Sequence, residues 1–390
     1  MPAGDTSDGA AQILIAGGGF AAIEAVLALR AFLDDRAALT VLAPDPVFHY
    51  RPAATSEPFD VAPSRRYDLR AIAADLGAEY HQSRLEAVAS HKRFVRTASG
   101  ARLQYDALIL ATGARAVVGV AGASIFRDQR DIPMIRRVLR EVEKGAVRSI
   151  VFALPAGSVW QLPLYELALL SARHAQERGL AIEATVITPE PEPLALFGPD
   201  ASKVVHGLLE ERGVRFVGGT VATGVRRGGS LALADGRVIE ADRVVALPEL
   251  RGRRFTGVPS SQSGFIPVDA SGLVEGLAQV YAAGDVTTFP IKQGGLAAQQ
   301  ADVVAQTISN GLGARTKAVR PPRVLLARLL GGDAPVFLRT EFDWSGQPIT
   351  AAAVRTGTER SAKAAKVFGR YLVPYLETRE PLADDRLAAA

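Results

Sequence analysis

The sequence predicts an α/β protein with two related parallel-sheet domains, the second inserted into the first, followed by a C-terminal α/β extension. Two observations predict this arrangement. A glycine-rich turn between a strand pattern and a helix pattern opens the chain near residue 12, and the same order of elements returns after residue 149. The segments that complete the first copy follow only after the second copy has ended, which indicates an insertion.

The first glycine-rich turn lies within residues 12–24, between an apolar strand pattern and an alanine-rich helix pattern. Gly17 permits a tight turn, Gly19 lets backbone amides approach a pyrophosphate, and Ala22 keeps the helix close to the strand. A plain glycine turn is the alternative, but the flanking strand and helix favour a nucleotide site. Its other members are Gly18, Phe20 and Ala21.

The next strand, residues 39–43, ends at a proline-flanked aspartate, Asp45. Asp45 either holds the ribose of a nucleotide or caps the turn. The loop that follows is aromatic and basic, and a loop at the carboxyl end of a parallel strand faces the ligand crevice. His49 and Arg51 in this loop are therefore candidates for a redox site, although His49 alone reads equally as a structural histidine.

Two hairpins mark the repeat. Residues 93–106 form the first and lead into an apolar strand that ends at Thr112 and Gly113, and residues 230–241 form the second. The predicted parts are a first segment of a dinucleotide-binding, Rossmann-like domain, an inserted domain of the same kind, the second segment of the first domain, and the C-terminal extension. Their predicted boundaries are 1–118, 119–260, 261–325 and 326–390.

The second copy lacks the features that bind a phosphate. Its strand-to-helix turn, residues 155–163, has one glycine, two prolines and a tryptophan where a phosphate needs bare amides. Leu247 and Pro248 stand where the first copy has Thr112 and Gly113. We expect this domain not to hold a dinucleotide in the usual way. The alternative is a variant loop that still binds a pyridine nucleotide, with Glu190 on its ribose.

The chain then returns to the first domain with a strand, residues 279–283, that ends in Gly284 and Asp285. A carboxylate at a strand end suits a chain of hydroxyl groups, although Asp285 reads alternatively as a helix cap. Lys292, Gln293 and Gly294 open a predicted helix. The amides and positive dipole of that helix N-terminus would suit an anionic ring.

Composition excludes several kinds of chemistry. The 390 residues include no cysteine, which rules out disulfides, thiolate zinc sites, iron–sulfur ligation and thiol redox steps, and no metal site is predicted. The net charge of +4 is small, and the basic runs at 65–66, 226–227 and 251–254 are scattered, so no nucleic-acid partner is expected. Without a secretory signal or an apolar run of membrane-spanning length, we expect a cytoplasmic protein.

The last part is less regular. Residues 336–342 and 349–354 read as paired strands. A predicted amphipathic helix over residues 361–372, stopped or kinked by Pro374, places Phe368, Tyr371 and Leu372 on one face and basic side chains on another. Such a face contacts the inner surface of a membrane peripherally, packs on the protein body, or meets the second subunit of a homodimer.

Together, these motifs resemble the flavoproteins with two dinucleotide-binding domains that are related to the pyridine nucleotide-disulfide oxidoreductases. Within them the chain is most similar to the branch of sulfide:quinone oxidoreductases and type II NADH dehydrogenases, over residues 12–310. The resemblance implies that FAD is the cofactor. It implies that Gly17, Gly19 and Ala22 hold the FAD pyrophosphate, and that Thr112 and Gly113 line the FAD site.

The resemblance also assigns the later motif. Gly284 and Asp285 would contact the ribityl chain and phosphate, and Lys292, Gln293 and Gly294 would face the pyrimidine edge of the flavin. Positive potential there would stabilise a reduced, anionic flavin.

Two departures from the family limit the reaction. Sulfide:quinone oxidoreductases carry a persulfide on cysteines, which this chain lacks, and type II NADH dehydrogenases need a working second glycine motif. We therefore predict an FAD-dependent oxidoreductase that passes electrons from an unidentified small donor through the flavin to a diffusible acceptor, a quinone. His49 and Arg51 would serve proton transfer or charge stabilisation, and Lys292 the reduced flavin.

Two alternatives remain open at this point. The first is an NAD(P)H:acceptor oxidoreductase with an unusual nicotinamide site. The second is a flavin-binding regulatory protein without turnover, which would use the Trp160 region for a partner.

Overall fold

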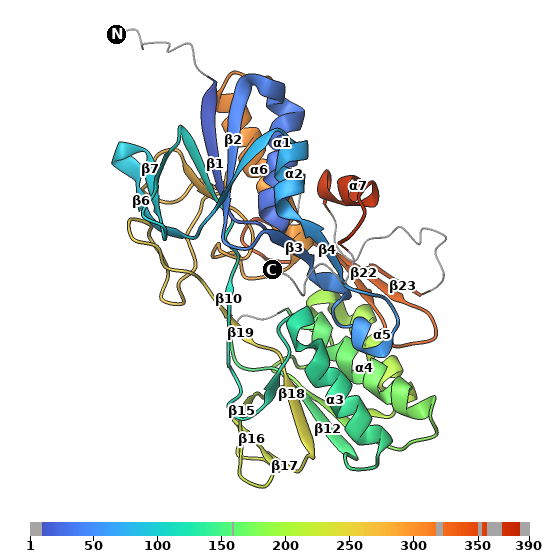
Figure 1. Cartoon of the computed structure of the whole chain (residues 1–390). Helices are drawn as coiled ribbons and strands as arrows, with labels where there is room; N and C mark the ends of the chain where they lie inside the picture. Colours follow the sequence, from blue (N-terminus) through green and yellow to red (C-terminus); the bar gives the residue numbers. More distant parts are fainter. Residues whose placement is uncertain (1–9, 158–159, 317–322, 350–352, 357–368, 383–390) are drawn as a thin grey trace.

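The computed structural model describes residues 10–157, 160–316, 323–349, 353–356 and 369–382. Two parallel sheets form separate lobes joined by a pair of connecting strands (Figure 1). This arrangement confirms the predicted α/β fold with two Rossmann-like domains and a C-terminal extension. The precise residue boundaries of the domains stay predictions.

The first sheet is parallel throughout, in the order β20-β9-β1-β2-β5. Apart from the edge strand β5, its strands are mainly apolar and buried, as expected for a parallel sheet covered on both faces. They span β1 (Ala11–Ala16), β2 (Ala37–Ala43), β5 (Ala78–Gln82), β9 (Ala107–Leu110) and β20 (Val280–Ala282).

Two long helices, α1 (Phe20–Leu33) and α6 (Gly294–Gly311), pack against each other beside this sheet (Figure 1). Both present small buried side chains, such as Ala21 on α1 and Ala297 on α6, so their backbones approach closely. The N-termini of both helices therefore lie together. Because backbone N–H groups point out of a helix N-terminus, this end of the domain suits an anion.

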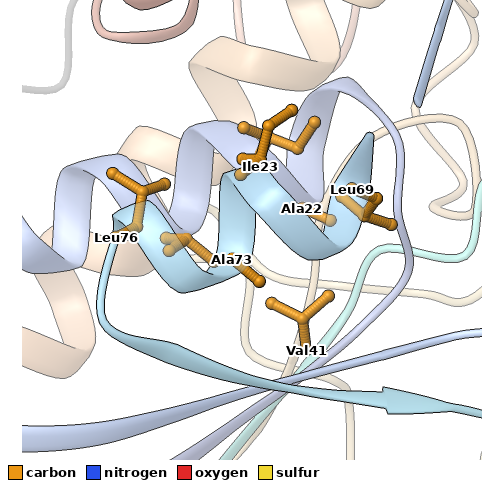
Figure 2. A pocket seen from close by; sticks show the side chains of 8 residues that line it. Ala22, Ile23, Val41, Leu69, Ala73 and Leu76 are labelled. Atoms are coloured by element: carbon orange, nitrogen blue, oxygen red, sulfur yellow. The ribbon is translucent and has the colours of Figure 1, made fainter. Parts of the chain in front are cut away.

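A small apolar cavity of about 10 Å³ lies between α1, β2 and the short helix α2 (Leu69–Asp75), as Figure 2 shows. A volume of this size holds about one water molecule at most, and an apolar lining leaves such a cavity dry. We interpret it as a packing gap and not as a ligand site. Its lining residues are Ala22, Ile23, Val26, Val41, Leu69, Ile72, Ala73 and Leu76.

Two strands connect the lobes. β10 (Arg115–Val117) leaves the first domain and β19 (Glu249–Arg251) returns to it, and the two pair in antiparallel fashion. The second sheet between them has the order β11-β18-β12-β13-β14, again parallel. Its strands are β11 (Ser124–Ile125), β12 (Ser149–Ala153), β13 (Glu183–Ile187), β14 (Val214–Val217) and β18 (Arg243–Ala246).

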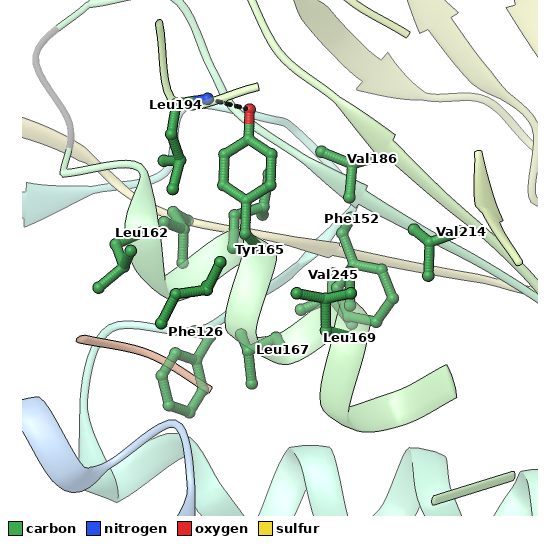
Figure 3. Close-up of a cluster of buried hydrophobic side chains, with 14 of the residues drawn as sticks. Phe126, Phe152, Leu162, Tyr165, Leu167, Leu169, Val186, Leu194, Val214 and Val245 are labelled. Carbon is green, nitrogen blue, oxygen red and sulfur yellow. Dashed lines mark hydrogen bonds between the residues drawn. The ribbon is translucent and has the colours of Figure 1, made fainter. Parts of the chain in front are cut away.

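Helices α3 (Ile132–Glu143), α4 (Leu162–Gln176) and α5 (Gly198–Glu211) lie along one side of this second sheet (Figure 1). Helix α4 is apolar on almost every face because it lies between the sheet and other elements. Figure 3 shows Tyr165 of α4 inside this core, with its ring among leucine and valine side chains. A buried tyrosine hydroxyl needs a hydrogen-bond partner, and the partner of Tyr165 bears on whether this domain can hold a nucleotide.

Smaller antiparallel sheets edge the two domains. β3 (Val47–Tyr50) pairs with β4 (Arg65–Asp68) beside the first sheet. The predicted repeated hairpins are present as β6 (Leu85–Ala89), β7 (Phe94–Thr97) and β8 (Arg102–Gln104), and as β15 (Ala222–Val225), β16 (Leu231–Leu233) and β17 (Val238–Ile239).

The C-terminal extension adds an antiparallel sheet of β21 (Arg323–Leu329), β22 (Val336–Phe342) and β23 (Ala353–Thr356). Its inner face completes the core of the second domain. The buried carboxylate of Glu166 on α4 links these parts. It accepts hydrogen bonds from the Thr55 hydroxyl of the first domain (2.6 Å) and from the Leu330 amide after β21 (3.2 Å).

The predicted amphipathic helix falls mostly outside the described residues, Phe368 included. The described helix is α7 (Leu372–Glu377), and it contains Pro374. The prediction that Pro374 ends a preceding helix is wrong, because proline is tolerated in the first turn of a helix, where its missing N–H has no intrahelical partner.

Leu372 and Leu376 pack in a cluster with Ile23, so these apolar side chains of α7 cover the protein body. The Glu24 carboxylate fastens the start of this helix, because it accepts hydrogen bonds from the amides of Tyr371 (2.8 Å) and Leu372 (2.7 Å). In the described ranges we find no helix with the length and apolar character of a membrane span.

Candidate functional site

The first glycine turn has the geometry of a backbone anion site. Gly17 has a φ of +144°, and a Cβ there would lie 2.1 Å from the carbonyl oxygen of Ala111, so only glycine fits. A Cβ at Gly19 would meet no atom within 4 Å. The N-terminus of α1 is therefore open at Gly19. By contrast, a Cβ at Gly18 would lie 2.5 Å from the Leu69 side chain, so Gly18 serves packing.

Thr112 and Gly113 lie directly after β9, next to this turn. The Thr112 hydroxyl is buried and has no hydrogen-bond partner within the described residues. An unpaired buried hydroxyl costs free energy, which a ligand that bonds to it would recover. A Cβ at Gly113 would have no neighbour within 4 Å, so this side of the turn is open as well.

The Gly284–Asp285 turn follows β20 and approaches the helices closely. A Cβ at Gly284 would lie 3.1 Å from the Cβ atoms of both Ala21 and Ala297. The Gly284 amide donates to Oε1 of Gln300 on α6 at 2.9 Å, a partner that sequence reasoning missed. Asp285 does not cap α6, because that helix is capped by Gln293. The alternative reading of Asp285 as a cap of this helix is therefore wrong.

Lys292 lies in the same region with its side chain buried. Its Nζ donates to the carbonyls of Thr287 and Phe289, the latter at 2.6 Å, and lies 3.8 Å from the centre of the Phe265 ring. Burial lowers the pKa of Lys292 to about 8, against the opposing effect of the Asp285 charge. Burial raises the pKa of Asp285, and Lys292 and Arg51 oppose that rise. The structure thus brings these three charges together.

Gln293 and Gly294 have structural tasks at the start of α6. The Gln293 side chain accepts a hydrogen bond from the Leu296 amide at 3.0 Å and so caps the helix. A Cβ at Gly294 would lie 3.2 Å from the Phe20 ring, which covers this end of the helix. The side-chain oxygen of Gln293 is therefore directed at its own helix, while its Nε2 donates to the Leu326 carbonyl of β21 at 3.4 Å.

The His49 ring contacts two side chains, those of Asp45 and Gln129. Its Nε2 lies 3.4 Å from Oδ2 of Asp45, and its Nδ1 contacts the side-chain amide of Gln129 in the inserted domain. Burial lowers the pKa of His49, while Asp45 raises it. Asp45 also caps its own turn, since it accepts the Val47 amide at 3.0 Å. Of the two readings of Asp45, the structure shows the turn cap.

Arg51 lies near enough to His49 and Asp285 for its charge to lower the pKa of each. Desolvation lowers the pKa of Arg253, and the charges of Arg115, Arg51 and Arg84 lower it further. All four arginines are exposed, and three of them act electrostatically on the fourth. Positive charges grouped in this way attract an anionic ligand.

In the inserted domain, the acidic residue that follows the second strand is buried and hydrogen-bonded within the protein. Glu190, after β13, is buried and accepts hydrogen bonds from the Tyr165 hydroxyl (2.8 Å) and the Thr188 hydroxyl (3.1 Å). A carboxylate that reads a ribose must offer its oxygens to the ligand. Glu190 instead satisfies the buried Tyr165 of Figure 3, which argues against a ribose contact.

A family comparison agrees with this geometry. The chain matches the family described as pyridine nucleotide-disulphide oxidoreductase over residues 11–150 and 165–305. The chain belongs to this family. The match confirms the predicted superfamily and FAD as its cofactor, and it supports an FAD-dependent oxidoreductase. The open Gly19 turn fits FAD, as does the buried Thr112 hydroxyl, which has no hydrogen-bond partner among the described residues.

Among its relatives, monodehydroascorbate reductase of Pisum sativum is 30% identical over 219 residues, 51% of this chain and 47% of that protein. Sulfide-quinone reductase of Aquifex aeolicus is 25% identical over 273 residues, 66% of this chain and 58% of that protein. The chain thus spans about half the length of the plant relatives it matches.

Solved structures share the fold. The sulfide:quinone oxidoreductase from Aquifex aeolicus has a TM-score of 0.78 at 19% identity, covering 89% of this chain and 87% of that chain. A covalent putidaredoxin reductase–putidaredoxin complex has a TM-score of 0.64 at 19% identity, covering 85% and 81%. These identities carry the fold and not the reaction.

Proposed function

We propose that the chain is an FAD-dependent oxidoreductase that passes electrons from a small donor through the flavin to a diffusible quinone. FAD supplies the redox chemistry when bound, and the protein's residues bind and tune it. The observation that carries the proposal is the contrast between the two domains. In the first domain the glycine turn is open at Gly19 and the Thr112 hydroxyl has no partner among the described residues, whereas in the inserted domain Glu190, which follows the second strand, is bonded internally.

The pyrophosphate is proposed to bind the backbone from Gly17 to Ala22, at the open N-terminus of α1. Thr112 would donate its hydroxyl to the cofactor, and Asp285 would accept from the ribityl hydroxyls. The backbone of Gly113, Gly284 and the start of α6 would complete the site. In this arrangement the side chain of Gln293 keeps its task as the cap of α6.

Charged residues near the proposed flavin would stabilise its reduced form and exchange protons with it. Lys292 and Arg51 bring positive charge to the Gly284–Asp285 turn, and positive charge favours a reduced, anionic flavin. His49, held by Asp45 and Gln129, is the proposed group for proton exchange, because its lowered pKa keeps the ring neutral near pH 7 and ready to accept a proton.

The quinone acceptor rests on the absence of cysteine and on the sulfide-quinone reductase relative. Without a thiol, electrons cannot pass through a disulfide of this chain, so the flavin must exchange them directly with its donor and acceptor. A lipid-soluble quinone is met at a membrane surface, and we therefore propose a cytoplasmic protein with peripheral contact there. A homodimer is the alternative use of the C-terminal region.

An NAD(P)H-dependent reaction is the second candidate, and the family name favours it. One anaerobic experiment separates the two. The flavin absorbance of the purified holoprotein is followed during titration with NADH and then NADPH, and the dithionite-reduced protein is then mixed with a short-chain ubiquinone. We expect no rapid bleaching by either nucleotide and rapid reoxidation by the quinone. Fast bleaching at micromolar nucleotide would contradict the closed second site, and a protein that takes up no FAD would overturn the proposal.

A further inference from the structure

Arg323 occupies an unusual place in the C-terminal sheet. The side chains of β21 alternate between the two faces of the sheet, and Arg323 shares the inward face with Leu325, Ala327 and Leu329. It is 8% exposed. An arginine at a core position needs a partner, because a buried cation without one is costly.

Much of this group has no acidic or hydrogen-bonding partner in the part of the chain that the structure describes. The Nε and Nη1 atoms of Arg323 are buried without a hydrogen bond within the described ranges. Burial lowers the pKa of Arg323 to about 10, and no described carboxylate raises it. The guanidinium is therefore a buried cation whose charge the described residues leave uncompensated.

Two aromatic rings lie beside the guanidinium. Its central carbon lies 4.3 Å from the centre of the Trp344 ring and 5.0 Å from that of Phe289. Aromatic faces attract a cation, but this attraction replaces neither the counter-charge nor the hydrogen bonds. Planar rings beside a planar fork also favour a flat ligand, which can stack while it accepts two parallel hydrogen bonds.

This cluster is joined to the proposed flavin site by direct contacts. The carbonyl of Phe289 accepts the hydrogen bond from Lys292, at 2.6 Å. On the other side, the turn that carries Trp344 packs on the same segment, because a Cβ at Gly346 would lie 2.5 Å from Pro290. Phe289 thus contacts both Arg323 and Lys292, and it alone separates the two cationic side chains along this path.

Helix α6 fixes the strand that carries Arg323. Gln299 of α6 donates to the Val324 carbonyl and accepts the Val324 amide, both at 2.8 Å. The residue next to Arg323 is therefore anchored to the helix whose N-terminus faces the proposed flavin. A rigid position of this kind suits a group that orients a substrate.

We propose that Arg323, with Phe289 and Trp344, binds a planar oxyanion, namely an aromatic carboxylate or a ring with an ionised oxygen, as the small substrate of this oxidoreductase. The inference rests on the proposed function and narrows its substrate class. Arg323 gives the charge and the two-point hydrogen bonding, and the rings give the stacking surface.

The binding test uses Trp344 as the reporter in the FAD-loaded Trp160→Phe protein, so that Trp344 is the only tryptophan. The probes are benzoate and its neutral isostere benzamide. We expect saturable change in tryptophan fluorescence with benzoate and at least about tenfold weaker binding of benzamide. Equal binding of the two probes would overturn the proposal, as would no binding of benzoate.

The variants are Arg323→Gln and Arg323→Lys, with Arg328→Gln on the opposite face of β21 as the matched control. Arg323→Gln should weaken benzoate binding by about tenfold or more, and Arg328→Gln should leave it unchanged. If Arg323→Gln does not fold, Arg323→Lys decides, because lysine keeps the charge but loses the fork and should weaken benzoate by several-fold. Unchanged affinity in the folded Arg323 variant would refute the site.

The design separates this inference from the proposed function. FAD content and quinone reoxidation of each variant are measured beside benzoate binding. A protein that binds FAD and reoxidises with quinone while benzoate binds independently of Arg323 would leave the function standing and reject this site. A protein without FAD would reject the function first.

Discussion

The hydroxyl of Tyr165 donates a 2.8 Å hydrogen bond to the carboxylate of Glu190 at the end of the second strand of the inserted domain. Both groups are buried, and Thr188 donates to the same carboxylate oxygen. Glu190 occupies the place from which an acidic residue reads a ribose in dinucleotide-binding folds. Here the carboxylate is bonded to an internal tyrosine, which stabilises the core of the inserted domain.

Tyr165→Phe tests this assignment. The substitution leaves the buried Glu190 with one hydroxyl donor fewer, and we expect the free energy of unfolding to fall by about 1–3 kcal/mol. Denaturant unfolding of the holoprotein measures the change. Tyr375→Phe, at a more exposed hydroxyl that bonds Asp75, is the control and should cost less. A gain of rapid flavin reduction by NADH in Tyr165→Phe would show that Glu190 can serve a nucleotide.

Gly17→Ala and Gly19→Ala form a matched pair. An added Cβ at Gly17 would lie 2.1 Å from the Ala111 carbonyl oxygen in a backbone conformation that alanine avoids, so this variant should fail to fold normally. At Gly19 the Cβ enters open space, and φ is an ordinary −102°. We expect that variant to fold and to bind FAD at least about tenfold more weakly. Circular dichroism and flavin content separate the two outcomes; FAD affinity unchanged in Gly19→Ala would refute the phosphate assignment.

Thr112→Val should lower the affinity for FAD without lowering the stability of the apoprotein. Removing an unpaired buried hydroxyl should leave the apoprotein equally stable or slightly more stable. Loss of the donor should weaken FAD by about fivefold to tenfold, since a hydrogen bond contributes about 1 kcal/mol. Apoprotein melting and FAD titration test the two parts. Weakened FAD binding together with a destabilised apoprotein would indicate a packing role instead.

The pair Glu24 and Asp302 predicts a pH dependence of stability. Burial, the charge of Glu24 and a hydrogen bond with it raise the pKa of Asp302 to about 8, while Arg370 opposes the rise. Burial also raises the pKa of Glu24. The unfolded chain has an ordinary aspartate pKa near 4, so the folded state alone keeps the proton between these values. Stability should therefore fall as pH rises from about 4 to about 8.

Asp302→Asn should remove most of this dependence. Asparagine is neutral at every pH, so the variant should melt at least about 3 °C above the parent at pH 8.5 and close to it at pH 5. Melting temperatures across pH 5 to 9 give the comparison. Glu211→Gln, an exposed site on α5, should leave the slope as it is. An identical slope in Asp302→Asn would exclude this pair as the source.

Local patterns predicted the parts of the fold that depend on neighbours in sequence. The turn at Gly17 and Gly19 is an example, because a strand, a turn and a helix in succession specify it within about twenty residues. The prolines of the second turn, residues 155–163, predict in the same local way that this turn does not hold a phosphate. These features need no knowledge of distant residues.

Contacts between distant residues could not be predicted. Nothing near Glu24 indicates that it binds the amide of Tyr371, which lies 347 residues later in the chain. Tyr165, the partner of Glu190, lies on α4, far from it in the sequence. Arg323 has the sequence features of an exposed residue, and only the pairing of β21 in its sheet shows that its side chain faces the core. Asp45 and Gln293 were candidates for ligand contacts, but the side chain of Asp45 caps a turn and that of Gln293 caps α6. The local sequence does not show whether a polar side chain binds a ligand or its own backbone.

Glu166 has a consequence for how substrates reach the flavin. Its buried carboxylate joins the loop at Thr55, the inserted domain and the amide of Leu330 in the C-terminal extension. A hinge that opened the two lobes would break the hydrogen bond between the Thr55 hydroxyl and the Glu166 carboxylate, and the loss of a buried hydrogen bond to a carboxylate costs about 1.5–3 kcal/mol. We expect the lobes to stay closed through turnover, so donor and acceptor must exchange by movements of loops and side chains.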